Sequence, residues 1–269
     1  MLDELRKIGV FIKRDFRIIL TYRLAFSAMF LNTVFTLFYF VFFGSMFGGQ
    51  TPSVLLPYGG SYISYILVGS VGWGFLWSVM GTTSISLRNE MMMGTLESVL
   101  LTVTRLSTIM IAYMLFGCFM GLITIAILLS VGFIAFDVAI MGNAYAVLIM
   151  FLSTLMMAGF GMIFGGLTIW MKNIGSTVPL IQNIALFFSG VFFPIAVLPE
   201  ILQPLARFIP FYYSIEGLRI SLRPDASVGE IYHFILILAI LSIIFITIGL
   251  FILKKGIIKA KKDGSLAFY

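Results

Sequence analysis

The sequence has 269 residues, of which 61% are hydrophobic and 10% are charged, and its formal net charge is +6. Soluble domains usually contain about 25% charged residues, so this composition excludes an ordinary soluble protein. A membrane-spanning helix needs about 20 predominantly apolar residues, so the length accommodates about six spans and no soluble catalytic domain. Because basic residues beside spans set the orientation in the membrane, we do not expect nucleic-acid binding.

The N-terminal segment, residues 2–20, is predicted to be an amphipathic helix that lies on the membrane. Its apolar side chains recur three or four residues apart, and most of its basic side chains fall on the other side. The alternative is a solvated basic lead-in that only fixes the orientation. We assign residues 1–23 to the interfacial helix, and we expect no cleaved signal because acidic residues accompany the basic ones before the first apolar run.

Six apolar stretches are predicted to cross the membrane as helices. They cover residues 24–43, 62–87, 108–136, 144–170, 174–193 and 232–253. The chain is therefore predicted to be one all-α membrane domain over residues 1–269. Within it, 24–193 holds spans one to five, 194–230 separates them from the sixth span in 231–253, and 254–269 is a basic tail.

The distribution of basic residues tests this arrangement. Six spans place both termini and the loops at 88–105 and 171–173 on one side of the membrane. All of the 17 basic residues except Arg207, Arg219 and Arg223 fall on that side. Because basic loops stay in the cytoplasm, we predict a multi-pass protein of the cytoplasmic (plasma) membrane with both termini cytoplasmic.

The segment 194–230 is apolar but contains four prolines, at positions 194, 199, 204 and 210. Each proline removes a backbone donor and clashes with the preceding turn, so one continuous spanning helix is excluded. Irregular backbone exposed to lipid is not tolerated at depth, so we predict a re-entrant hairpin of short helices in the outer leaflet. Glu216 and Arg219 are three residues apart and could pair on its last helix, or could mark the outer water boundary.

A charged stretch, residues 88–105, interrupts the apolar sequence after the second span. Glu90 and Glu97 are seven residues apart, so they would emerge on one side of a helix that breaks or bends at Gly94. The methionines at 91–93 add flexible apolar contacts. This pattern is typical of a docking element on the aqueous side, although any polytopic protein needs polar loops between its spans.

The sequence has no pattern that predicts catalysis or metal binding. It contains no GxxxxGK[ST] phosphate-binding loop, one histidine (His233) and no Cys/His/carboxylate cluster. We therefore expect no catalytic residue, no cofactor and no metal in this chain, and any ATP energy must come from a partner. The predicted spans carry essentially no charge at mid-depth, which argues against an ion-coupled carrier.

Uncharged polar and aromatic residues occur instead in spans one, two and five. They are Asn32, Thr33, Thr36, Trp73, Trp77, Ser78, Gln182 and Asn183. Such a wall suits an amphipathic or lipidic passenger, but each polar residue could equally hydrogen-bond between helices. Two GxxxG motifs, Gly117–Gly121 and Gly161–Gly165, would permit close helix packing.

Two stretches in this layout resemble one family of membrane proteins. The first comprises Arg88-Asn-Glu90, Gly94-Thr-Leu-Glu97 and Leu100-Leu-Thr102. The second comprises Ser189-Gly-Val-Phe-Phe-Pro194, Val197-Leu-Pro199, Pro210 and Glu216-Gly-Leu-Arg219. Together they resemble the ABC-2 family of ATP-binding-cassette transporter permeases, particularly its small drug- and lipid-export subunits. Val103 and Ile209 stand where that family often has proline and asparagine, so the resemblance indicates the family better than the substrate.

The resemblance implies a role for three sets of residues. The charged stretch would be a coupling helix that fits a cleft on a cytoplasmic ATPase, with contacts from Glu90, Gly94, Thr95, Leu96 and Glu97. Spans one, two and five would line a central seam between two subunits, with a path along Asn32, Thr36, Trp73, Trp77, Gln182, Asn183, Phe187, Phe188 and Phe192. The hairpin near the outer mouth would be shaped by Pro194, Pro199, Pro210, Glu216 and Arg219.

We therefore expect the permease subunit of an ABC exporter, a transport subunit and not an enzyme, that moves a hydrophobic or amphipathic drug, lipid or lipid-linked molecule. Its partners would be two copies of a cytoplasmic ABC ATPase that binds ATP and magnesium, a second permease copy in a homodimer, and membrane lipids. The alternatives are a polysaccharide or glycolipid exporter permease, a stand-alone carrier or channel, and a structural membrane-assembly protein.

Overall fold

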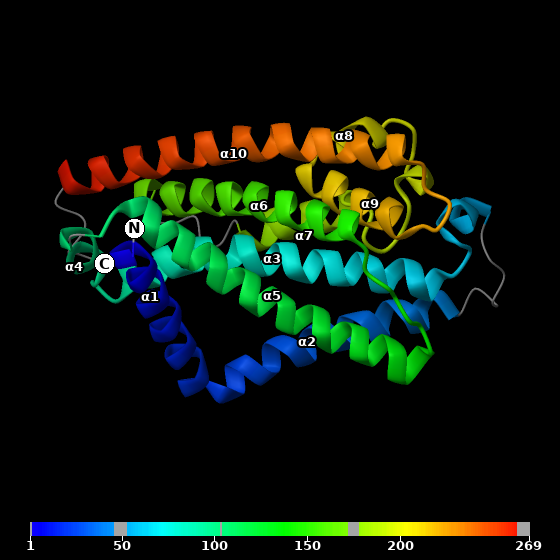
Figure 1. Cartoon of the computed structure of the whole chain (residues 1–269), viewed down its shortest axis with the longest axis horizontal. Helices are drawn as coiled ribbons and strands as arrows, with labels where there is room; N and C mark the ends of the chain where they lie inside the picture. Colours follow the sequence, from blue (N-terminus) through cyan, green and yellow to red (C-terminus); the bar gives the residue numbers. More distant parts are fainter. Residues whose placement is uncertain (1, 46–52, 103, 172–177, 263–269) are drawn as a thin grey trace.

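The computed structural model describes residues 2–45, 53–102, 104–171 and 178–262, and it contains helices and no strands within those ranges (Figure 1). The elements in chain order are α1 (Leu2–Thr21), α2 (Arg23–Ser45), η1 (Ser53–Tyr58), α3 (Tyr62–Met92), α4 (Leu96–Leu101), α5 (Leu106–Phe136), α6 (Ala144–Met171), α7 (Val178–Phe188), η2 (Ile195–Val197), α8 (Gln203–Phe208), α9 (Pro210–Leu222) and α10 (Val228–Lys262). The predicted all-α class is therefore confirmed.

Five of the described helices are long and apolar enough to cross a membrane, where six spans were predicted. They are α2 over Phe26–Gly44, α3, α5, α6 and α10. The predicted fifth span, 174–193, corresponds to α7, whose described part has 11 residues and ends at Phe188 because the chain turns at Gly190 (φ +75°). At 1.5 Å per residue it measures about 16 Å, roughly half of a bilayer core. Residues 172–177 of that predicted span lie outside the described residues.

The path of the chain between α6 and α10 shows whether it passes from one end of the bundle to the other. The end with α4, the N-terminus and the last turn of α10 is called the inner end here, and the opposite end, with η1 and α9, the outer end (Figure 1). Helix α6 finishes at the inner end, whereas α10 starts at the outer end. The chain between them therefore passes from one end to the other. A sixth crossing through α7 stays a prediction, as does the cytoplasmic location of the inner end.

Helix α3 occupies the centre of the bundle, and glycines let its neighbours approach it closely. A Cβ atom added at Gly117 of α5 would lie 2.8 Å from Cα of Val79, and one added at Gly161 of α6 would lie 2.8 Å from the carbonyl oxygen of Met80. Side chains at these positions would therefore push the backbones apart. The two GxxxG motifs thus serve close packing against α3 from two helices.

Helices α6 and α10 also meet through glycines, at two levels of the bundle. A Cβ atom added at Gly249 would lie 2.5 Å from the carbonyl oxygen of Gly159, and one added at Gly256 would lie 2.6 Å from that of Gly166. In each helix the two glycines are seven residues apart, which is two turns. Helix α10 also extends to Lys262, nine residues past the predicted end of the sixth span, because lysines are good helix formers whose charges reach water along a flexible stem.

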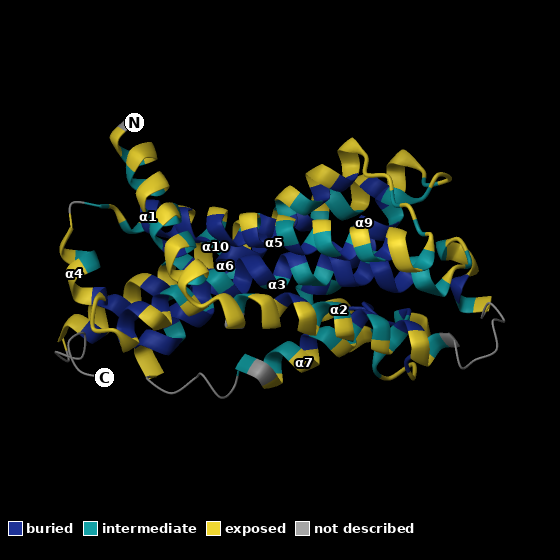
Figure 2. Ribbon diagram, turned by 90° about the horizontal axis from the view of Figure 1, so that it is seen from below, coloured by how far each residue is buried: buried dark blue, intermediate teal, exposed yellow. Residues whose placement is uncertain are grey.

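Helix α1 leaves the bundle at an angle and packs its apolar side against α5 (Figure 2). Phe11 lies edge-on to Tyr113 with ring centroids 6.3 Å apart, and Phe16 lies edge-on to Phe119 at 5.4 Å. The hydroxyl of Thr108 donates a hydrogen bond to Glu4 and, with Lys7, holds the pKa of that carboxyl below its usual value. The predicted amphipathic helix is therefore present, and its position on a membrane surface stays a prediction.

Candidate functional site

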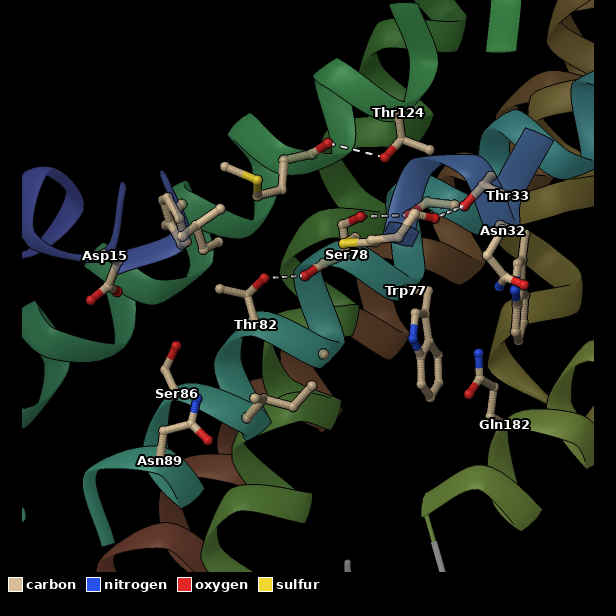
Figure 3. A pocket seen from close by; sticks show the side chains of 18 of the residues that line it. Asp15, Asn32, Thr33, Trp77, Ser78, Thr82, Ser86, Asn89, Thr124 and Gln182 are labelled. Atoms are coloured by element: carbon tan, nitrogen blue, oxygen red, sulfur yellow. Dashed lines mark hydrogen bonds between the residues drawn. The ribbon is translucent and has the colours of Figure 1, made fainter. Parts of the chain in front are cut away.

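A cavity of about 710 Å³ lies among α1, α2, α3, α5 and α7 (Figure 3). Its volume is within the range of small-molecule sites, about 300–1,000 Å³. Its lining is mainly apolar and runs from Arg14 and Glu90 at the inner end to Phe192 near the outer end. Such a cavity could hold an elongated molecule with an apolar body.

Most of the residues predicted for the passenger's path line this cavity. Helix α2 contributes Asn32 and Thr36, α3 contributes Trp73 and Trp77, and α7 contributes Gln182 and Asn183, with Phe192 following α7. Phe187 and Phe188 do not line it and instead contact each other edge-on, with centroids 5.1 Å apart. The structure therefore brings three predicted spans to one cavity, while its use as a transport path stays a prediction.

One face of α3 forms a wall of the cavity over almost the whole helix. Its lining residues recur three or four positions apart from Ser70 to Met93, a rise of about 35 Å. Ser86 and Asn89 belong to this wall (Figure 3) and were not singled out from the sequence. The helical spacing of small polar residues in an apolar span was the signal that could have identified them.

Several hydroxyl groups on the cavity wall donate their hydrogen bonds to backbone carbonyl groups of their own helices. Ser78 donates to the carbonyl of Gly74 at 2.7 Å, and Thr82 donates to that of Ser78 at 2.6 Å (Figure 3). Thr36 and Thr124 donate in the same way, four residues back. Because each hydroxyl keeps its lone pairs, this part of the wall offers hydrogen-bond acceptors to the cavity.

At the inner end, a cluster of side chains joins α1, α3 and α5. Arg14 Nη1 lies 2.6 Å from Glu90 Oε1, and Arg14 Nη2 lies 2.7 Å from Asp15 Oδ1. The hydroxyl of Tyr113 donates to Glu90 Oε1 at 3.3 Å, and that of Thr95 donates to Glu90 Oε2. Sequence reasoning missed these partners because Arg14 and Glu90 are far apart along the chain. Glu90 thereby connects the charged stretch to the interfacial helix.

Asp15 belongs to the same cluster and also lines the cavity. Its side chain is buried, and its Oδ2 atom has no hydrogen-bond partner among the described residues. Burial raises the pKa of the Asp15 carboxyl, and neighbouring Arg14 opposes that rise. The cluster therefore sets one guanidinium beside two carboxylates.

The predicted coupling segment breaks where the sequence indicated. Helix α3 ends at Met92, Gly94 adopts φ +68°, and α4 begins at Leu96. Gly94, Thr95 and Glu97 are exposed at the inner end, whereas Glu90 and Leu96 are 7% and 1% exposed. Contact of these five residues with an ATPase stays a prediction, and in this structure the side chains of Glu90 and Leu96 face the chain's own core.

At the outer end, Arg219 of α9 holds the turn that follows α7. Its Nη1 atom donates to the carbonyl of Gly190 at 2.7 Å, and its Nη2 atom donates to those of Val191 and Tyr65 at 2.8 and 3.2 Å. The guanidinium lies over the ring of Tyr65, 3.6 Å from its centroid. The side chain is therefore fixed mainly by main-chain carbonyl groups.

Glu216 completes this outer cluster. Its Oε2 atom lies 3.8 Å from Arg219 Nη1, and its Oε1 atom accepts a hydrogen bond of 2.6 Å from Tyr58. Burial raises the pKa of the Tyr58 hydroxyl, and the Glu216 carboxylate adds to the rise. The predicted pairing of Glu216 with Arg219 is present, and both side chains are buried within the protein. The alternative, that the two charges mark the outer water boundary, stays a prediction.

The prolines between α7 and α10 divide the segment into short helices joined by turns, as predicted. Pro194 precedes η2, Pro199 lies in an exposed turn, and Pro210 occupies the first turn of α9, where its missing N–H costs nothing. The segment thus forms the short helices α8 and α9. Its depth in a membrane stays a prediction. The described residues hold no group of three or more His, Cys, Asp or Glu that could bind a metal.

Comparison with known proteins assigns the chain to a family. Residues 6–223 match the family model for the ABC-2 type transporter, a span that includes the cavity and both charged clusters. A search of curated proteins gives no match. Subunits of this family are membrane transport subunits that are not themselves catalytic and normally work with a cytoplasmic ATPase, and the long apolar helices fit a multi-pass membrane protein. The chain therefore belongs to the ABC-2 type transporter family of permeases.

Proposed function

We propose that this permease moves a hydrophobic or amphipathic molecule, such as a drug, lipid or lipid-linked compound, out across the cytoplasmic membrane. The energy comes from ATP hydrolysed, with magnesium, by a separate cytoplasmic ATPase. The observation that carries this proposal is the cavity along α3, which runs from Glu90 and Met93, beside α4, to Phe192, just after the turn at Gly190. Beyond the charged group at the inner end, the wall consists of apolar, aromatic and uncharged polar side chains, which suit a passenger with an apolar body that leaves a lipid environment.

The inner end supplies the contact with the ATPase. Met92 and Met93 are 61% and 62% exposed, and Leu101 at the end of α4 is 75% exposed. Exposed apolar side chains clustered beside a charged residue, Glu97, are typical of a docking surface. Movement of this surface reaches the cavity through Glu90, because Glu90 contacts Arg14 of α1 and both residues line the cavity.

A second copy of the permease closes the open side of the cavity. Asn32 and Asn183 are exposed in one chain although they lie in apolar helices, and a polar side chain facing lipid is unfavourable. A homodimer that places α2 and α7 of two copies face to face covers them and makes the two cavities one seam. Two ATPase copies then bind at the inner end of the dimer.

An aromatic constriction closes the seam at rest near its outer half. Phe192 is 7% exposed and stacks on Phe40 of α2 with ring centroids 3.5 Å apart. Phe187 and Phe188 lie on the adjoining helix α7, and Phe187 also contacts Phe193 at 5.4 Å. ATP binding draws the two coupling segments together and parts these rings.

Substrate-stimulated ATP hydrolysis tests the proposal. The permease is reconstituted in proteoliposomes with its ATPase and challenged with candidate drugs and lipids. Asn183→Leu is expected to change the stimulation, whereas Thr247→Val, a polar-to-apolar change on exposed α10, serves as the matched control. Stimulation unchanged in Asn183→Leu, with damage from equivalent changes on α6, would place the passenger elsewhere. Stimulation by a lipid-linked polysaccharide alone would favour the glycan-exporting alternative.

A further inference from the structure

The charges that line the cavity are not balanced. Arg14 is the only lysine or arginine among the described lining residues, and it faces two carboxylates, Asp15 and Glu90. One guanidinium balances only one of the two carboxylates, so the inner end of the cavity carries an excess negative charge whenever Asp15 is ionised, a form that a bound cation would favour. In a site away from bulk water this charge acts more strongly on a ligand than it would in solution.

One carboxylate oxygen at this end also lacks a hydrogen bond. Asp15 Oδ2 is buried and has no partner among the described residues, although Oδ1 accepts from Arg14. An unsatisfied buried acceptor is unfavourable, and a donor that arrives through the cavity would satisfy it.

Several hydroxyl groups farther along the wall also offer acceptor oxygens to a ligand that carries hydrogen-bond donors. The hydroxyl hydrogens of Ser78, Thr82 and Thr124 are bound to backbone carbonyls, so their oxygens accept but do not donate. Ser70 Oγ, which is buried near the outer end of the wall, has no partner among the described residues. The bonded hydroxyls of Ser78, Thr82 and Thr124 therefore present acceptor oxygens to the cavity, beside the indole, amide and Ser70 groups that can donate.

Two tryptophan rings provide a surface for an aromatic or cationic group. Trp73 and Trp77 lie one turn apart on α3, with ring centroids 5.9 Å apart and planes 14° from parallel, and both are half-buried in the cavity wall. The face of an indole ring attracts cations more than the faces of the other aromatic side chains do.

From these observations we infer that the cavity selects amphipathic organic cations, in which a protonated amine carries the hydrogen-bond donors and an apolar body fills the aromatic part. The amine lies toward Asp15 and Glu90, and the body lies against Trp73 and Trp77. Phosphate, sulfonate or carboxylate heads are disfavoured because Arg14 is already paired. This inference rests on the proposed function and names its substrate class.

A protonated amine could belong to a water-soluble drug or to a membrane lipid, and binding experiments can separate these sources. The full-length protein in nanodiscs of neutral phosphatidylcholine is titrated with rhodamine 6G, a soluble aromatic cation, and binding is measured by fluorescence anisotropy against empty nanodiscs. Competitors are decylamine, decanol and decanoate, which differ only in the head group, and lysophosphatidylethanolamine. Displacement by the lysolipid at concentrations comparable with decylamine would identify a lipid source, and its failure to displace would identify a soluble one.

Decylamine is expected to displace rhodamine 6G at a concentration about tenfold or more below decanoate, because a hydrogen bond to a charged group is worth about that factor. Asp15→Asn is expected to weaken rhodamine binding about tenfold, Asp15→Glu to restore it, and Asp3→Asn on the exposed face of α1 to leave it unchanged. In Trp170→Phe, which keeps only the two cavity tryptophans, the ligand should still change the tryptophan emission.

The variant Asn89→Lys distinguishes a specific change in ligand binding from a loss of binding caused by misfolding. Asn89 is exposed at the inner end of the wall, where a long side chain can reach water, and the added cation should weaken rhodamine binding while it strengthens that of decanoate. A reversed preference cannot arise from misfolding. Equal competition by decylamine and decanoate, or wild-type affinity in Asp15→Asn, would overturn the inference and leave the proposed function standing. If none of the probes bound to folded protein, the cavity would not be a substrate site and the proposed function itself would lose its support.

Discussion

The charged clusters at the two ends of α3 are built from different kinds of contact. At the outer end, Arg219 is 5% exposed and donates to three main-chain carbonyl groups. At the inner end, Glu90 is held by the side chains of Arg14, Tyr113 and Thr95, and the Arg14 side chain is 34% exposed. Packed backbone moves only if the fold opens, whereas side chains change rotamer readily. The outer cluster is therefore fixed, and the inner one can rearrange.

This difference agrees with the expectation that the ATPase partner binds at the inner end. The exposed residues beside Gly94 lie at the end whose contacts are formed by side chains rather than by packed backbone. Movement imposed there can change the contacts of Glu90 and the shape of the cavity while the outer turn keeps its structure. Four substitutions test the contrast, and they are ordered by the expected effect on the stability of the folded protein.

The largest loss is expected for Arg219→Met. The substitution removes the donor for three carbonyls and leaves Glu216 without its ion-pair partner in a buried site, a change that typically costs about 3–5 kcal/mol. Thermal unfolding of the purified protein, followed by its intrinsic fluorescence, should show a much lower midpoint. Arg207→Met on exposed α8 is the control. Equal midpoints for the two variants would contradict a structural role for the outer cluster.

A smaller loss is expected for Glu90→Gln. The amide keeps the shape of the side chain but loses the ion pair with Arg14, so the free energy of unfolding should fall by about 1–3 kcal/mol. Substrate should then no longer stimulate the ATPase. A double-mutant cycle with Arg14→Gln measures the contact directly, because residues in one ion pair are not additive. Additive effects would indicate that the two residues act independently.

Asp15→Asn is expected to change the pH dependence of stability more than it changes the free energy of unfolding at any one pH. Burial raises the pKa of Asp15 in the folded protein above its unfolded value. Its contribution to stability is therefore fully present below the unfolded pKa and is lost as pH rises through the folded pKa. Unfolding midpoints measured from acid to neutral pH should fall less in Asp15→Asn than in the wild type. Parallel profiles would show that Asp15 titrates alike in both states.

The smallest effect on stability is expected for Glu97→Lys. Glu97 is exposed and forms no ion pair among the described contacts, so the free energy of unfolding should stay within about 0.5 kcal/mol of wild type. ATP hydrolysis should nevertheless become uncoupled from transport, because the charge at the docking surface is reversed. Glu200→Lys, exposed in the turn before α8, is the matched control. Normal coupling and normal capture of the ATPase would exclude Glu97 from that surface.

The sequence predicted the features that depend on local chemistry. Apolar runs and chain breakers placed the long helices, the break at Gly94 and the short helices after Pro194, and a three-residue spacing predicted the pairing of Glu216 with Arg219. Each of these signals lies within a few residues of the chain. That polar residues of three separate spans lie together was instead implied by the family resemblance, and they line one cavity.

Contacts between distant segments could not be predicted from the sequence. Arg14 and Glu90 belong to helices that meet only through the packing of α1 against α5, and Arg219 finds carbonyl groups that no side-chain pattern reveals. The apolar helix α5 gave little indication of which face lines the cavity. The early end of α7 follows from a turn at Gly190, whose left-handed backbone is not distinguishable from an ordinary glycine in a span.

The paired glycines of α6 and α10 separate these two closely packed helices from the helices that line the cavity. With backbone against backbone at Gly159–Gly249 and Gly166–Gly256, two long helices have almost no freedom to slide or rotate past each other. The two helices are expected to move as one rigid unit, and neither contributes a residue to the cavity lining. We therefore expect that, in a transport cycle, α1, α2 and α7 move relative to the paired helices α6 and α10.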